Sequence, residues 1–318
     1  MKGNMKAIFF LPLIFSAASA NLTIAAGSSK KHLIIGGDDE EIENFPPTVS
    51  FQVGNNHFCS GVVVSPLFVL TAAHCFESWV DGKSVKVDGG VSKINDNPLF
   101  EIKVKKYFLH KHYSASDVTN DLAMAVLDKP IPSPSIAIFA NSTPNFGTQF
   151  TALGWGIRDT DVGKTSPQLQ SMTMVRIQDE VCVGKVPNDI LCGLSLTRTA
   201  TPCSGDSGGG AFLNSYTVAG ILSYGFGCEN LNLPAAYTKT ETNKEFICCT
   251  SQNQAVFSNT DGCDVDLTEC DISVEKEMNT EISVVLIVVI VCSSIFVFVL
   301  LILILQEIKQ RRPPELYV

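Results

Sequence analysis

The chain has 318 residues, a formal net charge of −9 and a hydrophobic content of 45%. This length and composition allow one large domain or two medium ones with a sizeable core. The acidic balance argues against a nucleic-acid partner, because such a partner needs a basic face.

Residues 1–20, "MKGNMKAIFFLPLIFSAASA", begin with lysines, continue with an apolar run and end in small residues. This order is typical of a cleaved signal peptide, so we expect the chain to enter the secretory pathway. There the eleven cysteines favour disulfides over catalytic thiols. No Cys-x-x-Cys pair or His/Cys cluster has metal-ligand spacing, so we expect neither a metal nor another cofactor.

Further along, short β-rich runs such as "TVSFQV" and "TVAGILSYG" alternate with Gly, Pro and Asn turns, which predicts an all-β fold. In "LTAAHCF", His74 directly precedes Cys75, and Cys59 lies sixteen positions earlier. A disulfide between these cysteines would pin the loop that carries the histidine. A lone histidine, however, more often has an ordinary core or surface role.

Two further segments carry polar groups that catalysis could use. Asp121 precedes the apolar run in "NDLAMAVL", and Ser207 lies among glycines in "PCSGDSGGGAF". By themselves, an acid at a strand start and a glycine cluster are usually turn features. Together with His74 they give the chain order His, Asp, Ser, which is one of the known orders of a catalytic triad.

Six motifs then carry a resemblance to a known family. The segments "IIGG", "LTAAHC", "DLAMAVL", "GWG", "CSGDSGG" and "ILSYG" resemble those of the chymotrypsin-like (S1, trypsin-fold) serine peptidases. The resemblance places a peptidase domain at residues 34–250. It implies two six-stranded β-barrels with the active site between them, followed by a short C-terminal helix.

The resemblance also implies a role for each residue of the triad. His74 would act as general base and then as general acid, Asp121 would orient it, and Ser207 would be the nucleophile. The backbone amides of Gly205 and Ser207 would form the oxyanion hole.

In the family, cleavage of an inactive precursor frees an isoleucine amine that pairs with the acid beside the nucleophile. Here Ile34 would pair with Asp206 after removal of a propeptide, residues 21–33. Many relatives have Arg or Lys before the isoleucine, whereas this chain has Leu33. A chain never cut at this bond would stay inactive.

By resemblance, Thr201 forms the base of the substrate pocket, where trypsin-like members have Asp. The absence of charge predicts an apolar preference, which Leu33 itself would satisfy, and this suggests self-activation. The other predicted pocket residues are Ser223, Tyr224, Gly225 and Ala235, and Ser223 is also expected to support Asp121.

Disulfides Cys182–Cys192 and Cys203–Cys228 are implied by the resemblance. Where many relatives have a further disulfide, this chain has Phe150 and Leu213, which predicts apolar packing in its place. Four cysteines have no family counterpart, so their pairing stays open: Cys248, Cys249, Cys263 and Cys270. They fall in or beside an acidic segment, residues 251–281, interpreted as a stem. A solvated linker is favoured there over a calcium site.

Residues 282–305 are uncharged, include Cys292, and are long enough for a transmembrane helix. Basic residues in the tail, 306–318, predict a single-pass type I protein with its peptidase domain outside the cell or in a secretory lumen. Asn21 and Asn141 lie in glycosylation sequons.

These observations predict a serine endopeptidase with protein or peptide substrates and a protein inhibitor as a further candidate partner. One alternative is a catalytically silent homologue that serves as a surface binding or adhesion module. A weaker idea is that the C-terminal "ELYV" binds a PDZ-type domain by strand addition.

Overall fold

The structure is a computed structural model. It describes residues 37–78, 80, 83–159, 163–183, 189–198, 200–228, 230–258, 262–272, 275–277 and 298. The chain divides into two compact units, Met1–Lys31 and His32–Val318, and the first lies wholly outside the described residues. The predicted signal peptide, propeptide, Ile34 and cytoplasmic tail also lie outside them. So does the predicted membrane span, apart from the helical Phe298.

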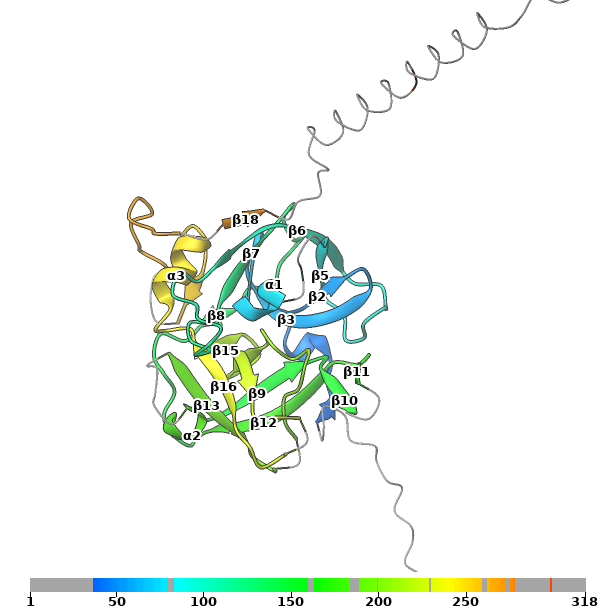
Figure 1. Ribbon diagram of the computed structural model, residues 1–318, viewed down its shortest axis with the longest axis vertical. Coiled ribbons are helices and arrows are strands. Elements are labelled where there is room, and N and C mark those ends of the chain that lie inside the picture. The colour runs from blue at the N-terminus through cyan, green and yellow to red at the C-terminus, as the bar shows by residue number, and fades with distance from the viewer. Residues whose placement is uncertain are drawn as a thin grey trace, which may run out of the picture. The chain divides into compact units, whose positions relative to one another are not determined.

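The first barrel is closed by the pairing of its first and last strands in the sheet, β6 and β7 (Figure 1). Its six strands follow the sheet order β6-β5-β2-β3-β4-β7. They are β2 (Thr48–Val53), β3 (Asn56–Ser65), β4 (Phe68–Thr71), β5 (Val85–Gly89), β6 (Phe100–Leu109) and β7 (Ala123–Leu127).

The second barrel is closed in the same way, by β14 pairing with β15. Its strands, in the sheet order β14-β9-β12-β13-β16-β15, are β9 (Gln149–Gly154), β12 (Gln170–Arg176), β13 (Ile190–Ser195), β14 (Gly210–Phe212), β15 (Thr217–Gly225) and β16 (Ala235–Lys239). The prediction of two six-stranded barrels is therefore confirmed. Short strands flank the barrels: β1 (Asp38–Asp39), β8 (Ile138–Phe139), β10 (Ile157–Asp159), β11 (Lys164–Thr165) and β17 (Val256–Phe257).

Three large apolar clusters form the core. One fills the first barrel around Phe51 and Phe76, and another fills the second barrel around Phe150 and Tyr237. The partly buried Leu213 packs against the second cluster, so apolar contacts do occupy the place of the absent disulfide. The third cluster draws residues from both barrels, including the fully buried Trp155, and holds them together.

Helices are few and short among the described residues: η1 (Ile42–Asn44), α1 (Ala73–Ser78), α2 (Glu180–Val183) and α3 (Lys244–Thr250). The predicted C-terminal helix is α3. The sequence did not indicate α1 or α2, because segments of six and four residues are too short to show a helical period. Within the described part of the chain, no helix is both long and apolar enough to cross a membrane.

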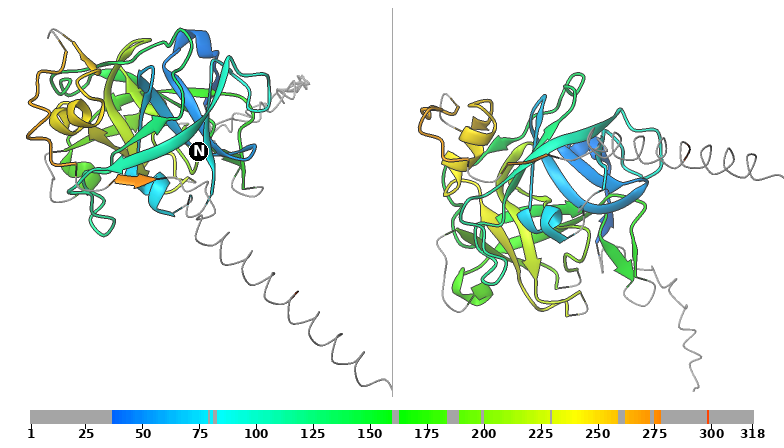
Figure 2. Two further views of the ribbon diagram at one scale, coloured as in Figure 1. Left: turned by 90° about the horizontal axis from the view of Figure 1, so that it is seen from above. Right: turned by 45° about the horizontal axis from the view of Figure 1, so that its top comes forward.

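The segment after α3 is attached to the barrels rather than following them as a separate linker. Disulfides Cys248–Cys263 and Cys249–Cys270 fix it to the helix. Beyond them, β18 (Glu275–Glu277) pairs antiparallel with residues 106–108 of β6 (Figures 1 and 2, orange). Because β5 pairs only with the first half of β6, β18 occupies an edge that the barrel leaves open.

Candidate active site

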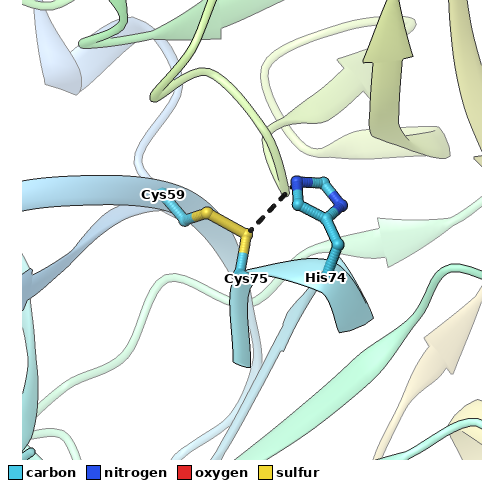
Figure 3. A group of neighbouring side chains, drawn as sticks. All are labelled: Cys59, His74 and Cys75. Carbon is cyan, nitrogen blue, oxygen red and sulfur yellow. Dashed lines mark hydrogen bonds between the residues drawn. A yellow bond between two sulfur atoms is a disulfide. The ribbon is translucent and has the colours of Figure 1, made fainter. Parts of the chain in front are cut away.

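His74 is held at the edge of the first barrel by a strand, a helix and a disulfide. The buried strand β4 leads directly into α1, where His74 is the second residue. The next residue, Cys75, is bonded to Cys59 of β3, which ties the helix to the sheet (Figure 3). The Cys75 sulfur lies 4.0 Å from His74 Nε2. Because the two sulfurs are bonded to each other, this His/Cys group offers no thiolate for a metal.

Asp121 fixes the orientation of the His74 ring. Asp121 is fully buried, and its Oδ2 lies 2.7 Å from His74 Nδ1. Its Oδ1 accepts a hydrogen bond from the main-chain N–H of His74 at 2.9 Å. The hydroxyl of Ser223 donates to Oδ2 at 2.5 Å. Since a carboxylate only accepts, the imidazole proton lies on Nδ1, which leaves Nε2 as a base.

Ser207 lies in the loop between β13 and β14, where neighbouring peptide groups are fixed by hydrogen bonds. The carbonyl of Ser204 accepts from Ile157 N at 2.8 Å, and that of Asp206 accepts from Gly209 N at 3.0 Å. In a trans peptide the N–H points away from the preceding carbonyl. The amides of Gly205 and Ser207 therefore point away from these bonds, and neither has an acceptor among the described residues.

The backbone of this loop favours glycine at two positions, Gly205 and Gly208, because both have positive φ. Gly205 has φ +103°, a value that residues with a Cβ atom rarely adopt. Its carbonyl accepts from His57 at 2.8 Å and from the Ser60 hydroxyl at 3.4 Å. The Ser60 main-chain N–H donates to the Ser207 carbonyl at 2.8 Å. Strand β3 of the first barrel thus holds the serine loop of the second.

His57 is a residue that the sequence did not single out. It is buried, its Nε2 lies 2.8 Å from the Gly205 carbonyl, and its Nδ1 lies 2.8 Å from the Ser50 hydroxyl. Burial lowers the pKa of His57 to about 4, and the bond to Gly205 opposes this shift. The ring is therefore neutral at pH 7, with Nε2 as donor and Nδ1 as acceptor. A histidine two residues before Cys59 in a strand carries no signal that would have revealed this role.

Asp206, beside Ser207, is a buried acid without an ion pair among the described residues. Its carboxylate accepts from Gly156 N at 2.7 Å and from Cys203 N at 2.9 Å. Burial raises the pKa of Asp206 to about 6, and these two bonds lower it. A Cβ atom on Gly156 would lie 2.4 Å from Asp206 Oδ2, so glycine is needed for this approach. The predicted partner, Ile34, lies outside the described residues.

A cleft of about 280 Å³ opens beside Ser207. Three predicted pocket residues, Ser223, Tyr224 and Gly225, line it. Thr201 and Ala235 are buried at 2% and 0% exposure and are absent from its lining. Ala235 of β16 pairs with Gly225 of β15, so it lies on the strand next to the one that lines the cleft. The remaining described lining residues are Pro202, Cys203, Ser204, Leu222, Gly227 and Cys228, so none of the described residues that line the cleft has a charged side chain.

The three disulfides predicted on either side of this site are present. Cys59–Cys75 supports His74, Cys203–Cys228 joins the serine loop to the cleft wall, and Cys182–Cys192 ties α2 to β13. The structure therefore brings the predicted histidine, aspartate and serine loop together from both barrels. It adds His57, Ser50 and Ser60, which hold the serine loop through hydrogen bonds and are absent from the lining of the cleft.

The first barrel carries a histidine that a buried aspartate orients. The second carries a serine loop whose Gly205 and Ser207 amides have no acceptor among the described residues. This arrangement defines a class of serine peptidases. Residues 34–247 match the sequence profile described as Trypsin. The chain belongs to the trypsin family and is a serine endopeptidase.

Individual relatives extend this comparison. The trypsin of Phaedon cochleariae is 31% identical over 227 residues, which cover 67% of this chain and 86% of the relative. Hypodermin-B of Hypoderma lineatum is 28% identical over 251 residues, covering 75% and 96%. Among solved structures, neuropsin, a serine protease expressed in the limbic system of mouse brain, has a TM-score of 0.61 at 24% identity. That alignment covers 68% of this chain and 98% of neuropsin, and it supports the fold.

Proposed function

We propose that His74, Asp121 and Ser207 form the catalytic triad of this endopeptidase. Nε2 of His74 takes the proton of the Ser207 hydroxyl as Oγ attacks the substrate carbonyl. Asp121 stabilises the imidazolium, which then protonates the leaving amine. The observation that carries this proposal is the 2.7 Å hydrogen bond from His74 Nδ1 to Asp121, because it leaves Nε2 of the neutral ring free to accept a proton.

The oxyanion hole in this proposal consists of the Gly205 and Ser207 amides. Both amides have no acceptor among the described residues, which suits them to bind the negative charge of a tetrahedral intermediate. Losing one such donor costs about 10² to 10³ in kcat. The bonds from His57, Ser60 and Ile157 support this assignment, because they keep the peptide groups of the loop in place before substrate binds.

Activation is proposed to require cleavage between Leu33 and Ile34. An ionised carboxylate buried like that of Asp206 is costly without a cationic partner, and the freed amine of Ile34 would supply one. The described residues that line the cleft carry no charge, which supports cleavage after apolar residues and makes Leu33 acceptable to the enzyme itself. If purified precursor carrying Ser207→Ala were processed at Leu33 as fast as wild type, self-activation would be excluded.

We further propose that the enzyme is a type I membrane protein that acts outside the cell or in a secretory lumen. The uncharged run at residues 282–305 and the basic residues beyond it support the tether. All ten cysteines outside that run form disulfides, which suits an oxidising compartment. Asn21 and the half-buried Asn141 are the candidate glycosylation sites.

A cleavage profile tests the enzymatic part of the proposal. The soluble chain, residues 21–281 with an engineered protease site before Ile34, would be cut and incubated with a peptide library. We expect cleavage mainly after Leu, Met or aromatic residues, and none with Ser207→Ala. A preference for Arg or Lys would contradict the apolar cleft, and equal cleavage by Ser207→Ala would contradict the triad.

A further inference from the structure

The main chain just before Asp121 adopts an uncommon backbone conformation. Asn120, the residue before it, has φ +50°, in the left-handed region, which is uncommon for residues with a side chain although asparagine adopts it more readily than most. The N–H of Leu122 then donates to the Asn120 carbonyl at 2.8 Å, so the chain turns tightly around Asp121. The direction of the Asp121 carboxylate therefore depends on what keeps Asn120 in place.

A second buried acid, from the other barrel, holds Asn120. Asp189 directly precedes β13 and is 8% exposed. Its Oδ2 accepts the main-chain N–H of Asn120 at 2.7 Å. Its own carbonyl accepts from Lys239 N, at the end of β16, at 2.6 Å. The carboxylate is thus fixed to the second barrel and reaches across to the loop between β6 and β7 of the first.

We infer that Asp189 is a positioning residue for the triad: through Asn120 it sets the orientation of Asp121, and through Asp121 that of His74. This inference rests on the triad of the proposed function. Among the described residues, Asp189 forms no hydrogen bond or ion pair with His74 or Ser207, so its effect is indirect. A hydrogen bond to a charged acceptor is stronger than a neutral one, which suits this bond to hold a strained backbone.

Other contacts from the second barrel to the main chain of this turn are weaker. The Thr238 hydroxyl lies 3.5 Å from the Asp121 carbonyl, a long hydrogen bond from the second barrel. The Asn120 side chain donates to His112 O at 3.1 Å, within its own loop. Ser223, also from the second barrel, bonds the Asp121 side chain at 2.5 Å, whereas Asp189 provides the short bond from that barrel to the main chain of the turn.

A test of this inference must distinguish the effect of the Asp189 charge from the effect of its hydrogen bond to Asn120. Burial raises the pKa of Tyr224, which lines the cleft, and the charge of Asp189 raises it further. On the other side, Tyr113 and Glu77 are joined by a 3.0 Å hydrogen bond. Burial raises the pKa of Tyr113, and the charge of Asp121 raises it further. Asp189→Asn keeps an acceptor oxygen and removes the charge, whereas Asp189→Ala removes both.

The test compares these two variants with wild type after cleavage before Ile34. We expect Asp189→Ala to lower kcat at least 10-fold with little change in KM, and to move the acid limb of the kcat/KM profile to lower pH. A poorly held Asp121 stabilises the His74 imidazolium less, which explains the direction of this shift. Asp189→Asn is expected to stay within about 3-fold of wild type with an unchanged acid limb.

Asp128→Ala is the matched control, because it makes the same substitution at an exposed acid. We expect it to retain wild-type kcat and pH profile. If Asp189→Ala fails to fold, Asp189→Glu replaces it, since that side chain keeps the charge but is one methylene longer. It should then show the loss in kcat and the same pH shift. Wild-type kinetics in a folded Asp189→Ala or Asp189→Glu variant would overturn the inference.

One readout does not depend on turnover. The proton between His74 Nδ1 and Asp121 should give a far-downfield NMR resonance in wild type and in Asp189→Asn. We expect it to broaden or move upfield in Asp189→Ala. An unchanged resonance in that variant would also overturn the inference. Wild-type protein that shows the resonance but does not react at Ser207 would instead contradict the proposed function.

Discussion

His57 of the first barrel is hydrogen-bonded to the carbonyl of Gly205 in the second, with 2.8 Å between Nε2 and the oxygen. The Ser50 hydroxyl lies at the opposite ring nitrogen, also at 2.8 Å. A neutral, buried histidine thus fixes the peptide group beside the proposed oxyanion hole. Its contribution to catalysis can be separated from that of the triad, because the hydrogen bonds of His57 join it to Ser50 and Gly205 and, among the described residues, not to the triad.

Replacing His57 should impair the oxyanion hole more than substrate binding. We expect His57→Phe, which fills the space but leaves the Gly205 carbonyl unsatisfied, to lower kcat about 10- to 100-fold with KM nearly unchanged. Steady-state kinetics of the cleaved protein test this. The exposed His112 provides the control, and His112→Phe should behave as wild type. Equal kinetics for the two variants would contradict a role for His57.

The stability of the uncleaved precursor should depend on two buried groups with opposite pH responses. The pKa of Asp206 is raised from 3.8 to about 6, so its contribution to stability is full below pH 3.8 and is lost as the pH rises through 6. The pKa of His57 is lowered from 6.5 to about 4, so its contribution is full above pH 6.5 and is lost as the pH falls through 4. Each shift corresponds to about 3 kcal/mol.

Asp206→Asn separates the two responses. In the precursor it should gain stability relative to wild type between pH 4 and 6.5, by about 3 kcal/mol in all, because it removes an acid that is costly to ionise. After cleavage, the Ile34 amine should pair with Asp206, and the same variant should be less stable than wild type at pH 7. Urea unfolding at several pH values measures both. A variant effect of the same sign before and after cleavage would exclude the Ile34–Asp206 pair.

Gly156 should not tolerate even a methyl group. A Cβ atom there would lie 2.4 Å from Asp206 Oδ2, whereas a Cβ atom on Gly147 would meet nothing within 4 Å. We expect Gly156→Ala to lower the free energy of unfolding by about 2 kcal/mol or more and to abolish most activity. Gly147→Ala is unfavourable only because the new residue must adopt a positive φ. It should lower the free energy of unfolding by about 1 kcal/mol and leave kcat unchanged. Similar losses in the two variants would show that the approach to Asp206 is unimportant.

The segment after α3 should stabilise the first barrel through β18. Truncation after Thr250, with Cys248 and Cys249 replaced by Ser, removes two disulfides and exposes the open edge of β6. We expect a loss of about 2 to 5 kcal/mol in the free energy of unfolding. Truncation after Asp271, which keeps both disulfides but removes β18, isolates the strand pairing. If that shorter truncation neither lowers stability nor promotes self-association, β18 has no protective role at the edge.

Short local motifs in the sequence were enough to predict much of the fold and of the active site. Three of these motifs are visible in the sequence alone: His74 beside Cys75, Asp121 before a strand, and Ser207 among glycines. The contacts that hold these residues in place join distant segments: His57 and Gly205 are 148 positions apart, and Asn120 and Asp189 are 69 apart. A single buried histidine or aspartate has no periodicity or spacing that reveals its partner.

The pairing of the last four cysteines shows the same limit. Cys248 and Cys249 are adjacent, and either could reach Cys263 or Cys270 by chain length alone, so only the fold distinguishes the alternatives. The pairing of β18 with β6 likewise depends on an open barrel edge, which no pattern in residues 251–281 indicates.

The central claim is that Ser207 is a nucleophile whose oxyanion site is completed by cleavage before Ile34. Its most direct test is labelling with a fluorophosphonate, followed by mass spectrometric mapping of the modified residue, before and after cleavage at an engineered site. We predict fast labelling of Ser207 only in the cleaved chain, and none with Ser207→Ala or Asp206→Asn. A folded, cleaved protein that is not labelled at Ser207, or a precursor labelled as fast as the cleaved form, would contradict the claim.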